Sequence, residues 1–130
     1  CVTHSKIKAE GESMKNEKAE LILNGMMQEL RRGSITLAVL SQLKEPKYGY
    51  SLVVLMNEKG FDVEANTLDP LLRRLEKQEI LESIWDTDGM NPRKFYKLSE
   101  FGESIFAQLC ATWEEMNEVV NRLIKKGEKE

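Results

Sequence analysis

The pattern of hydrophobic positions is clearest between residues 66 and 79. Leu68, Leu71, Leu72 and Leu75 repeat at three- and four-residue intervals, which predicts an amphipathic helix with a single leucine face. The arginine and lysine side chains of this segment fall mostly on its other faces. The pattern therefore predicts a short helix that packs inward through leucine and presents cations outward.

Polar residues at the start of this segment can act as helix caps. Asn66 or Thr67 can accept a hydrogen bond from a backbone N–H of the first turn. Pro70 then lies at or near the end of the first turn, where backbone N–H groups have few intrahelical partners to lose. Thr67 has a second interpretation, as a contact to a DNA base or phosphate.

Two short strands are predicted after this helix. An apolar segment at 80–85 precedes the polar run 86–91, and a segment in which polar and apolar residues alternate follows at 93–98. The second strand begins with Arg93 and Lys94, whose fixed positive charge suits contacts to a nucleic-acid backbone. A solvated hairpin without a ligand is the alternative interpretation.

Two helices are predicted before the leucine-rich segment. The first spans residues 33–43 and ends before Pro46, because the residue before a proline disfavours helical backbone angles. The second spans Tyr48 to Lys59 and is stopped by Gly60, which suits a left-handed helix terminus. The order helix, helix, helix, hairpin is typical of a winged helix-turn-helix, whose third helix can enter a major groove.

A long amphipathic helix is predicted from Phe101 to Lys126. At about 1.5 Å per residue it is about 39 Å long, too long for its own small domain to cover. Such a helix most economically buries its apolar stripe against a second copy of the chain, which also places two recognition helices on a two-fold DNA site. The sequence therefore predicts a homodimer. The predicted interface residues are Leu109, Trp113, Met116, Val120 and Leu123.

The predicted fold is mainly α with a small β-hairpin, and it has three regions. Residues 1–28 are a polar tail, disordered or partly helical, residues 29–98 are a winged helix-turn-helix DNA-binding domain, and residues 99–130 are a dimerisation helix. At least the first thirteen residues are interpreted as a leader or tail. Residues 15–30 have some helical spacing, so they either extend the next helix or remain mobile.

Composition favours a small binding module. The 130 residues suffice for one domain, and no apolar run approaches the roughly 20 residues of a membrane-spanning helix. His4, Cys1 and Cys110 form no cluster, so no zinc site, disulfide framework or histidine-based catalysis is expected, and Cys110 is interpreted as a buried free thiol. No nucleophile with a base and no glycine-rich phosphate loop is visible. We therefore expect a cytoplasmic protein that is not an enzyme and needs no cofactor, metal or membrane.

A net charge of −3 is unfavourable for a protein that binds DNA, but the charges are unevenly distributed. Residues 66–98 carry six cations and six acids, while residues 91–97 carry three cations and no acid. Residues 99–130 hold seven acids against four cations. Because attraction to phosphate is screened over about 8 to 10 Å in physiological salt, the acidic C-terminal helix need not prevent binding by the hairpin.

Four motifs lie in order at compatible spacings: Tyr48–Tyr50, Thr67–Leu72, Arg74–Glu76 and Arg93–Tyr96. Together they resemble the PadR-like family of winged-helix transcriptional regulators. The resemblance runs from about Leu30 to the C-terminus and is closest to the short-form branch, which has a single C-terminal helix. It implies a homodimeric repressor that binds double-stranded DNA at a roughly palindromic operator and is released by a small ligand.

The resemblance also implies an effector site at Trp113. Some short-form members sense flat aromatic or cationic compounds between the subunits, where a tryptophan of the C-terminal helix stacks on the ligand. Trp113 is the matching residue, and an indole offers a large π-face to such compounds. The alternative is that Trp113 only packs the dimer interface.

Eight residues are predicted to contact DNA, and one of them departs from the family pattern. Position 69 is usually tyrosine in the family, whereas Asp69 would repel phosphate. Asp69 therefore either accepts a hydrogen bond from a cytosine amino group or marks weakened DNA binding. The second possibility leaves open a dimeric protein-interaction module that has lost specific DNA binding. The predicted contacts are Tyr48, Asn66, Thr67, Asp69, Arg73, Arg93, Lys94 and Tyr96.

Two further side chains near these contacts are assigned structural roles. Tyr50 is expected to pack into the core, which leaves Tyr48 as the tyrosine that reaches DNA from the start of the second helix. Arg74 is expected to pair with Glu76 or Asp69 instead of reading a base. Arg93 and Lys94 are both expected to contact the DNA backbone.

Overall fold

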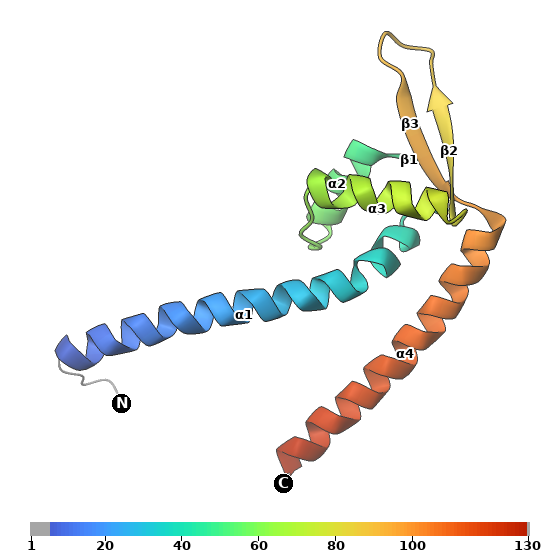
Figure 1. Cartoon of the computed structure of the whole chain (residues 1–130). Helices are drawn as coiled ribbons and strands as arrows, with labels where there is room; N and C mark the ends of the chain where they lie inside the picture. Colours follow the sequence, from blue (N-terminus) through green and yellow to red (C-terminus); the bar gives the residue numbers. More distant parts are fainter. Residues whose placement is uncertain (1–5, 130) are drawn as a thin grey trace. The chain divides into compact units, whose positions relative to one another are not determined.

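A computed structural model describes residues 6–129, with side chains described for residues 15–125. Its helices and three-stranded antiparallel sheet follow the predicted winged helix-turn-helix order with a long C-terminal helix (Figure 1). The chain divides into two compact units after Ile35, and each unit is described separately. The elements are α1 (Lys6–Ser41), β1 (Lys47–Tyr48), α2 (Gly49–Glu58), α3 (Ala65–Lys77), β2 (Leu81–Asp86), β3 (Arg93–Leu98) and α4 (Glu100–Lys129).

The helix α1 is longer than the sequence predicted. It begins at Lys6, whereas the prediction was a polar tail that is disordered or partly helical, followed by a helix from Gly33. Alanine, leucine, methionine, glutamate and lysine dominate residues 15–30, and all of these are good helix formers. Every described side chain from 15 to 30 is exposed, and helix propensity is sufficient to account for this extension. The predicted boundary between residues 28 and 29 falls inside α1.

The core of the second unit gathers around the leucine face of α3. All four predicted leucines of that face are buried, which confirms the helical pattern. Each such side chain contributes about 1.5 to 3 kcal/mol through the burial of its apolar surface. The buried hydrophobic residues are Val39, Leu40, Leu43, Leu52, Met56, Val63, Leu68, Leu71, Leu72, Leu75, Leu81, Tyr96 and Leu98.

The helix α3 begins earlier than its polar residues suggested. Its N-cap residue is Glu64, which has an extended backbone, and no side chain caps the first turn. The prediction that Asn66 or Thr67 caps the helix is therefore wrong, and both lie inside the first turn. Pro70 lies in the second turn, where the carbonyl of Asn66 loses its i+4 donor. Asn66 and Pro70 are exposed, so water can bind that carbonyl.

The end of α3 contains a non-glycine residue with a positive φ. Glu79 has φ of 66°, and the N–H of Ile80 donates to the carbonyl of Leu75 at 3.0 Å. This is the left-handed helix terminus at which glycine is usually preferred, because a β-carbon crowds the backbone there.

Glu79→Gly is expected to raise the free energy of unfolding by about 0.5 to 1 kcal/mol, because glycine adopts this conformation without steric cost. Urea unfolding followed by circular dichroism measures the change. Glu79→Ala is the matched control, since it removes the same carboxylate but keeps a β-carbon. Equal stability of the glycine and alanine variants would contradict the assignment.

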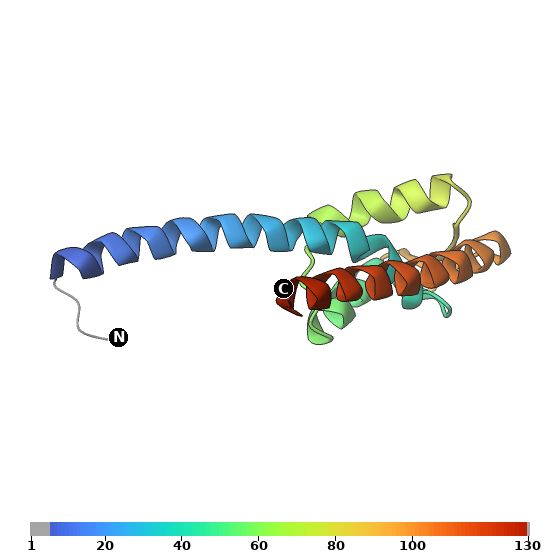
Figure 2. The same ribbon diagram turned by 90° about the horizontal axis from the view of Figure 1, so that it is seen from below.

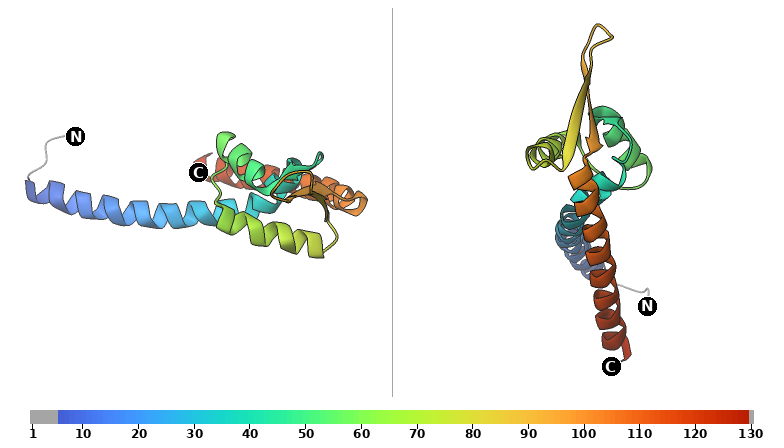
Figure 3. Two further views of the ribbon diagram at one scale, coloured as in Figure 1. Left: turned by 90° about the horizontal axis from the view of Figure 1, so that it is seen from above. Right: turned by 90° about the vertical axis from the view of Figure 1, so that its right-hand side faces the viewer.

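The sheet has the order β1-β3-β2, and all its pairings are antiparallel. The hairpin of β2 and β3 pairs Leu81 with Leu98 at its base and Asp86 with Arg93 at its far end. It extends past α2 and α3, as the right-hand view of Figure 3 shows. This confirms the two predicted strands and identifies the hairpin as the wing.

The strand β1 was not predicted. The sequence placed the start of the second helix at Tyr48, but α2 begins at Gly49, and Tyr48 is its extended N-cap residue with ψ of 139°. Tyr48 pairs with Phe95 of β3, and Lys47 pairs with Tyr96. A two-residue strand is too short to show a period, so only its long-range pairing with β3 reveals it.

The first turn of α4 is joined to the base of the wing. Ser99 is 8% exposed, and its hydroxyl accepts a hydrogen bond from the Gly102 N–H at 2.9 Å and donates to the Glu79 carbonyl at 2.6 Å. A β-carbon on Gly102 would lie 2.0 Å from the carbonyl oxygen of Ile80. The close approach of these backbones at Gly102 therefore leaves no room for a side chain.

The rest of α4 leaves the domain (Figure 1), and α4 is one continuous helix (Figure 2). Ile105 and Phe106 are half-buried, whereas every residue from 111 to 125 is exposed. Cys110 is a free thiol and is only partly buried, so the prediction of a buried thiol was too strong. The predicted helix from 101 to 126 is confirmed, with one further residue at its start and three at its end.

Candidate nucleic-acid interface

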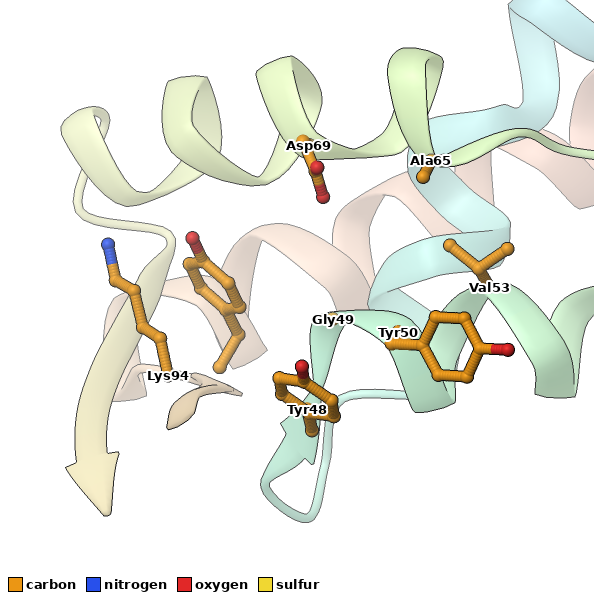
Figure 4. A pocket seen from close by; sticks show the side chains of 8 residues that line it. Tyr48, Gly49, Tyr50, Val53, Ala65, Asp69 and Lys94 are labelled. Atoms are coloured by element: carbon orange, nitrogen blue, oxygen red, sulfur yellow. The ribbon is translucent and has the colours of Figure 1, made fainter. Parts of the chain in front are cut away.

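A hollow of about 290 Å³ lies where α2, α3 and the wing meet (Figure 4). It is open to solvent and combines tyrosine rings with one carboxylate and one ammonium group. The turn between α2 and α3 brings the two helices together, and β1 ties the start of α2 to β3. The lining residues are Tyr48, Gly49, Tyr50, Val53, Ala65, Asp69, Lys94 and Tyr96.

The two tyrosines at the start of α2 differ in their surroundings. Tyr48 is half-buried, its ring centroid lies 6.1 Å from that of Phe95, and the Arg93 guanidinium carbon lies 5.4 Å from the Tyr48 ring. Tyr50 is 68% exposed, so the prediction that it packs into the core is wrong. Leu52 faces the core, and Tyr50, two residues earlier, points roughly the opposite way at about 100° per residue.

Asp69 faces the N-terminus of α2 across the hollow (Figure 4). Its Oδ1 atom lies 3.9 Å from the position that a β-carbon on Gly49 would occupy. The backbone N–H groups and dipole at a helix N-terminus attract negative charge. The carboxylate therefore stands where these groups would otherwise favour a DNA phosphate.

Four polar residues of α3 are exposed, namely Asn66, Thr67, Asp69 and Arg73. At about 100° per residue, Asn66 and Arg73 lie opposite the buried leucines, while Thr67 and Asp69 lie on the two flanks of this outer face. Of the four, Asp69 is the one that lines the hollow. Arg74 is also exposed, and among the described residues it makes no ion pair. The expected pairing of Arg74 with Glu76 or Asp69 is therefore wrong, because residues two or five positions apart on a helix do not face each other, and Glu76 pairs with Lys94 instead.

Lys94 and Glu76 form an ion pair between the wing and α3. Lys94 Nζ lies 2.8 Å from Glu76 Oε1, and the hydroxyl of Ser83 donates to Glu76 Oε2. The hydrogen bond from Lys94, followed by that from Ser83, lowers the pKa of Glu76 below its ordinary value of 4.5. The hydrogen bond to Glu76 raises the pKa of Lys94 above its ordinary value of 10.5.

These two pKa shifts define the pH range in which the ion pair stabilises the fold. A lowered pKa of Glu76 contributes stability that is present above the ordinary glutamate pKa and is lost as pH falls through the folded value. A raised pKa of Lys94 contributes stability that is lost only as pH rises above the ordinary lysine pKa. The ion pair is therefore intact at neutral pH.

The tip of the wing carries two acids, and the cations of the wing follow along β3, beginning with Arg93 opposite Asp86. Asp86 and Asp88 lie in or beside the turn, where the N–H of Asp88 donates to Asp86 Oδ1 at 3.1 Å. Arg93 is exposed and faces Asp86 across the hairpin, while Lys97 is half-buried near the base. Arg93 is therefore the wing cation most accessible to a phosphate.

Tyr96 lines the hollow but is only 8% exposed. Most of its side chain is buried in the core, so at most one edge of the ring is accessible to DNA. A buried tyrosine in this strand could have been expected from the alternation, because Leu98, two residues later, faces the same side and is also buried.

A stripe of exposed hydrophobic side chains follows α4 in the region predicted for the dimer interface. Trp113 is 46% exposed and Leu123 is 65% exposed. Both lie beyond the part of α4 that packs against its own domain. The predicted members of the stripe, all exposed, are Leu109, Trp113, Met116, Val120 and Leu123, and Val119 and Ile124 are exposed beside them.

Metal ligation and membrane insertion find no support in the part of the chain that the structure describes. Within it, no three histidine, cysteine, aspartate or glutamate side chains gather in a group that could hold a metal ion. No helix among these residues has the length and apolar character needed to cross a membrane. His4 and Cys1 lie outside the described residues.

Comparisons with known proteins agree with this geometry. The family model for the transcriptional regulator PadR-like family matches residues 36–108. A PadR family transcriptional regulator from Eggerthella lenta is 42% identical, with a TM-score of 0.80 over 83% of this chain and 96% of that one. A PadR-like regulator from Bacillus cereus is 25% identical, with a TM-score of 0.67 over 74% of this chain and 96% of that one. An uncharacterised Lysinibacillus sphaericus protein is 26% identical over 61% of this chain and 76% of its own length.

The family match covers the helix-turn-helix, the wing and the first part of α4, which are the elements that build the hollow and its outer face. It covers more than half of the chain, and the fold agrees with solved members over most of their length. The chain belongs to the PadR-like family of transcriptional regulators.

Proposed function

We propose that this protein binds double-stranded DNA sequence-specifically as a homodimer and represses transcription from a pseudo-palindromic operator. The observation that carries the proposal is the outer face of α3, which is polar and exposed while the opposite leucine face is buried. The residues that we assign to DNA contact are Tyr48, Asn66, Thr67, Asp69, Arg73 and Arg93. A protein with this activity works where the chromosome is, which for a cell without a nucleus is the cytoplasm.

Each proposed contact follows from its position. Thr67 and Asp69 lie in the first half of α3, the part of a recognition helix that reaches base edges in helix-turn-helix proteins. Arg73 lies one turn further on, and Arg93 lies on the wing, where fixed cations suit phosphates. Tyr48, beside the start of α2, can donate a hydrogen bond from its hydroxyl to a phosphate.

The homodimer is supported by the exposed stripe on α4. A helix with this many exposed hydrophobic residues along one face is unfavourable in water, and a second copy of the same helix can cover it. Trp113 lies within that stripe, so a planar aromatic or cationic effector could stack on its indole between subunits. Packing of Trp113 in the interface without an effector is the alternative.

One observation favours a second function, a dimeric protein-interaction module without specific DNA binding. Asp69 faces the start of α2, and Asp86 and Asp88 make the wing tip acidic. All three carboxylates would repel DNA phosphates brought close to them. We favour the regulator, because Arg73, Arg93 and the amide and hydroxyl groups of Asn66 and Thr67 are exposed and accessible to DNA.

Fluorescence anisotropy distinguishes the two functions. The full chain is titrated onto labelled duplex DNA from immediately upstream of its own gene and onto a scrambled duplex, at two salt concentrations. Tight binding that prefers the upstream DNA and weakens with salt is expected for an autoregulated repressor. Equal or negligible binding to both duplexes would favour the interaction module.

Asp69→Asn is expected to tighten binding to the scrambled duplex and to reduce discrimination in favour of the preferred duplex by about 1 to 3 kcal/mol. Binding to the scrambled duplex tightens because a negative charge near the phosphates is removed, and discrimination falls because a carboxylate that accepts from a cytosine amino group is lost. Asp69→Tyr, which restores the usual family residue, should likewise change both affinity and sequence preference. Asp62→Asn is the control, since Asp62 is an exposed acid in the preceding loop. Unchanged affinity and preference for both Asp69 variants would contradict a role in recognition.

A further inference from the structure

We propose that Lys94 is a positioning residue, which holds the wing against the recognition helix and does not itself contact a phosphate. The proposal rests on the DNA-binding function proposed above. It assigns to Lys94 a role different from that of the neighbouring Arg93, although both cations begin the same strand.

One carboxylate links three elements at this point. Glu76 of α3 accepts a hydrogen bond from Lys94 of β3 at one oxygen, with Nζ and Oε1 2.8 Å apart, and from Ser83 of β2 at the other. Both oxygens of Glu76 are therefore engaged by the wing. Because a carboxylate that accepts two hydrogen bonds fixes both donors, it restrains both strands relative to α3.

The surroundings of the Lys94 ammonium favour this contact over an exposed one. Lys94 Nζ lies 5.1 Å from the centre of the Tyr96 ring and 5.8 Å from that of Trp85. Its side chain is 26% exposed, and that of Glu76 is 30% exposed. An ammonium held between a carboxylate and two aromatic rings would have to give up these contacts to reach a phosphate.

The sheet register explains why these groups meet. Ser83 pairs with Tyr96 and Trp85 pairs with Lys94, so the four side chains lie on one face of the two-stranded hairpin. Glu76 lies on the last full turn of α3, near the point where the chain turns into β2. The pairing of β1 with β3 attaches one strand of the wing to the start of α2, and the Glu76 contact adds an attachment of both wing strands to α3.

The consequence for DNA binding is geometric. Arg93 directly precedes Lys94 in β3, so the position of Lys94 sets the position of Arg93 relative to the outer face of α3. If the ion pair is lost, the wing can change its direction relative to α3. Arg93 on the wing and the polar groups of α3 then no longer contact the same DNA duplex at the same time. Loss of Glu76 should therefore weaken binding, although removal of an acid near DNA ordinarily strengthens it.

The test compares Glu76→Gln and Lys94→Met with the charge-reversed pair Glu76→Lys/Lys94→Glu in the full chain. Affinity for the upstream duplex and its salt dependence are measured by anisotropy. Glu79→Gln is the matched control, because Glu79 is an exposed acid three residues from Glu76 whose carboxylate makes no described contact. A second readout without DNA is fluorine NMR of protein labelled with 5-fluorotryptophan, with the Trp85 signal assigned by Trp85→Phe.

We expect Glu76→Gln and Lys94→Met each to weaken binding about tenfold, as for loss of one charge-assisted hydrogen bond, while Glu79→Gln does not weaken it. The reversed pair should recover affinity relative to either single variant. In Glu76→Gln the Trp85 resonance should shift or broaden, although neither Trp85 nor Lys94 is replaced. The Trp113 resonance should stay in place, and a circular dichroism spectrum like that of the wild type shows that the fold is kept.

Two results would overturn the proposal. The first combines two observations. In Lys94→Met, the slope of log affinity against log salt concentration falls by about 0.9, as for one lost phosphate contact, and Glu76→Gln binds the duplex more tightly. The second is a Trp85 resonance that is unchanged in Glu76→Gln. If the wild-type protein shows no preference for the upstream duplex, the proposed function fails. The Trp85 resonance of Glu76→Gln then decides alone whether Lys94 holds the wing. A shift of that resonance supports this role, and an unchanged resonance overturns it.

Discussion

Gly102→Ala is expected to destabilise the second unit by more than about 3 kcal/mol, through overpacking and the loss of buried hydrogen bonds. The alanine β-carbon would lie 2.0 Å from the Ile80 carbonyl oxygen and 2.9 Å from its carbonyl carbon. Both of these atoms belong to the backbone, so a change of side-chain rotamer cannot relieve the clash. Either α4 or the turn between α3 and β2 must shift, and both are held by Ser99.

The same substitution should also separate α4 from the wing. The Ser99 N–H donates to the Ile80 carbonyl at 3.0 Å, and the Gly102 N–H donates to the Ser99 hydroxyl. A displaced Ile80 carbonyl would break the first bond and strain the second. Chemical denaturation followed by circular dichroism measures the loss, and the amide hydrogen exchange of Gly102 and Ser99 locates it.

Gly33→Ala is the matched control for Gly102→Ala. Both glycines lie inside helices, but a β-carbon on Gly33 would have no atom within 4 Å. Alanine there should stabilise the helix by about 0.5 to 1 kcal/mol, because alanine is the better helix former. A small change in stability for Gly102→Ala, comparable to that for Gly33→Ala, would contradict the close approach at Ile80.

Val120→Glu is expected to convert the protein from a dimer to a monomer and to lower its affinity for an operator by about a hundredfold or more. Val120 lies within the exposed stripe of α4, and a carboxylate there would be buried against a second α4 without a partner. The affinity falls because two linked recognition helices bind a two-fold site far more tightly than one does. Analytical ultracentrifugation and anisotropy on the same samples measure both effects.

Ala111→Glu is the control for Val120→Glu. Ala111 is exposed on α4, and its position nine residues earlier places it on the opposite side of the helix at about 100° per residue. A glutamate there should leave the dimer and DNA binding unchanged. A Val120→Glu protein that remains dimeric with unchanged circular dichroism would show that subunits associate through another surface.

Local periodicity was enough to predict much of the DNA-binding domain. The leucine face of α3, the two strands of the wing and the amphipathic α4 each repeat within a few residues, and the structure confirms all three. The motifs that resembled the PadR-like family lie on the same elements. Periodicity also indicated that the outer face of α3 is polar, which is the basis of the proposed function.

Contacts between distant residues were not predictable in the same way. The sequence predicted that Arg74 pairs with Glu76 or Asp69, but Glu76 pairs with Lys94 from a different element. Tyr50 was expected in the core, yet the start of α2, which the β1 pairing sets, turns it outward. Both errors come from interactions between residues that lie far apart in the sequence.

The sequence by itself determined which residues form the helices and the hairpin of the second unit and which faces of them are apolar, because these properties depend on side chains a few positions apart. Only the tertiary structure decided which polar groups meet. The Lys94 contact to Glu76, the Asp69 carboxylate facing α2 and the close approach at Gly102 join segments that packing brings together. The burial of the α3 leucines drives that packing, and the hydrophobic effect has no preferred direction. The polar contacts form where the packed geometry places a hydrogen-bond donor beside an acceptor.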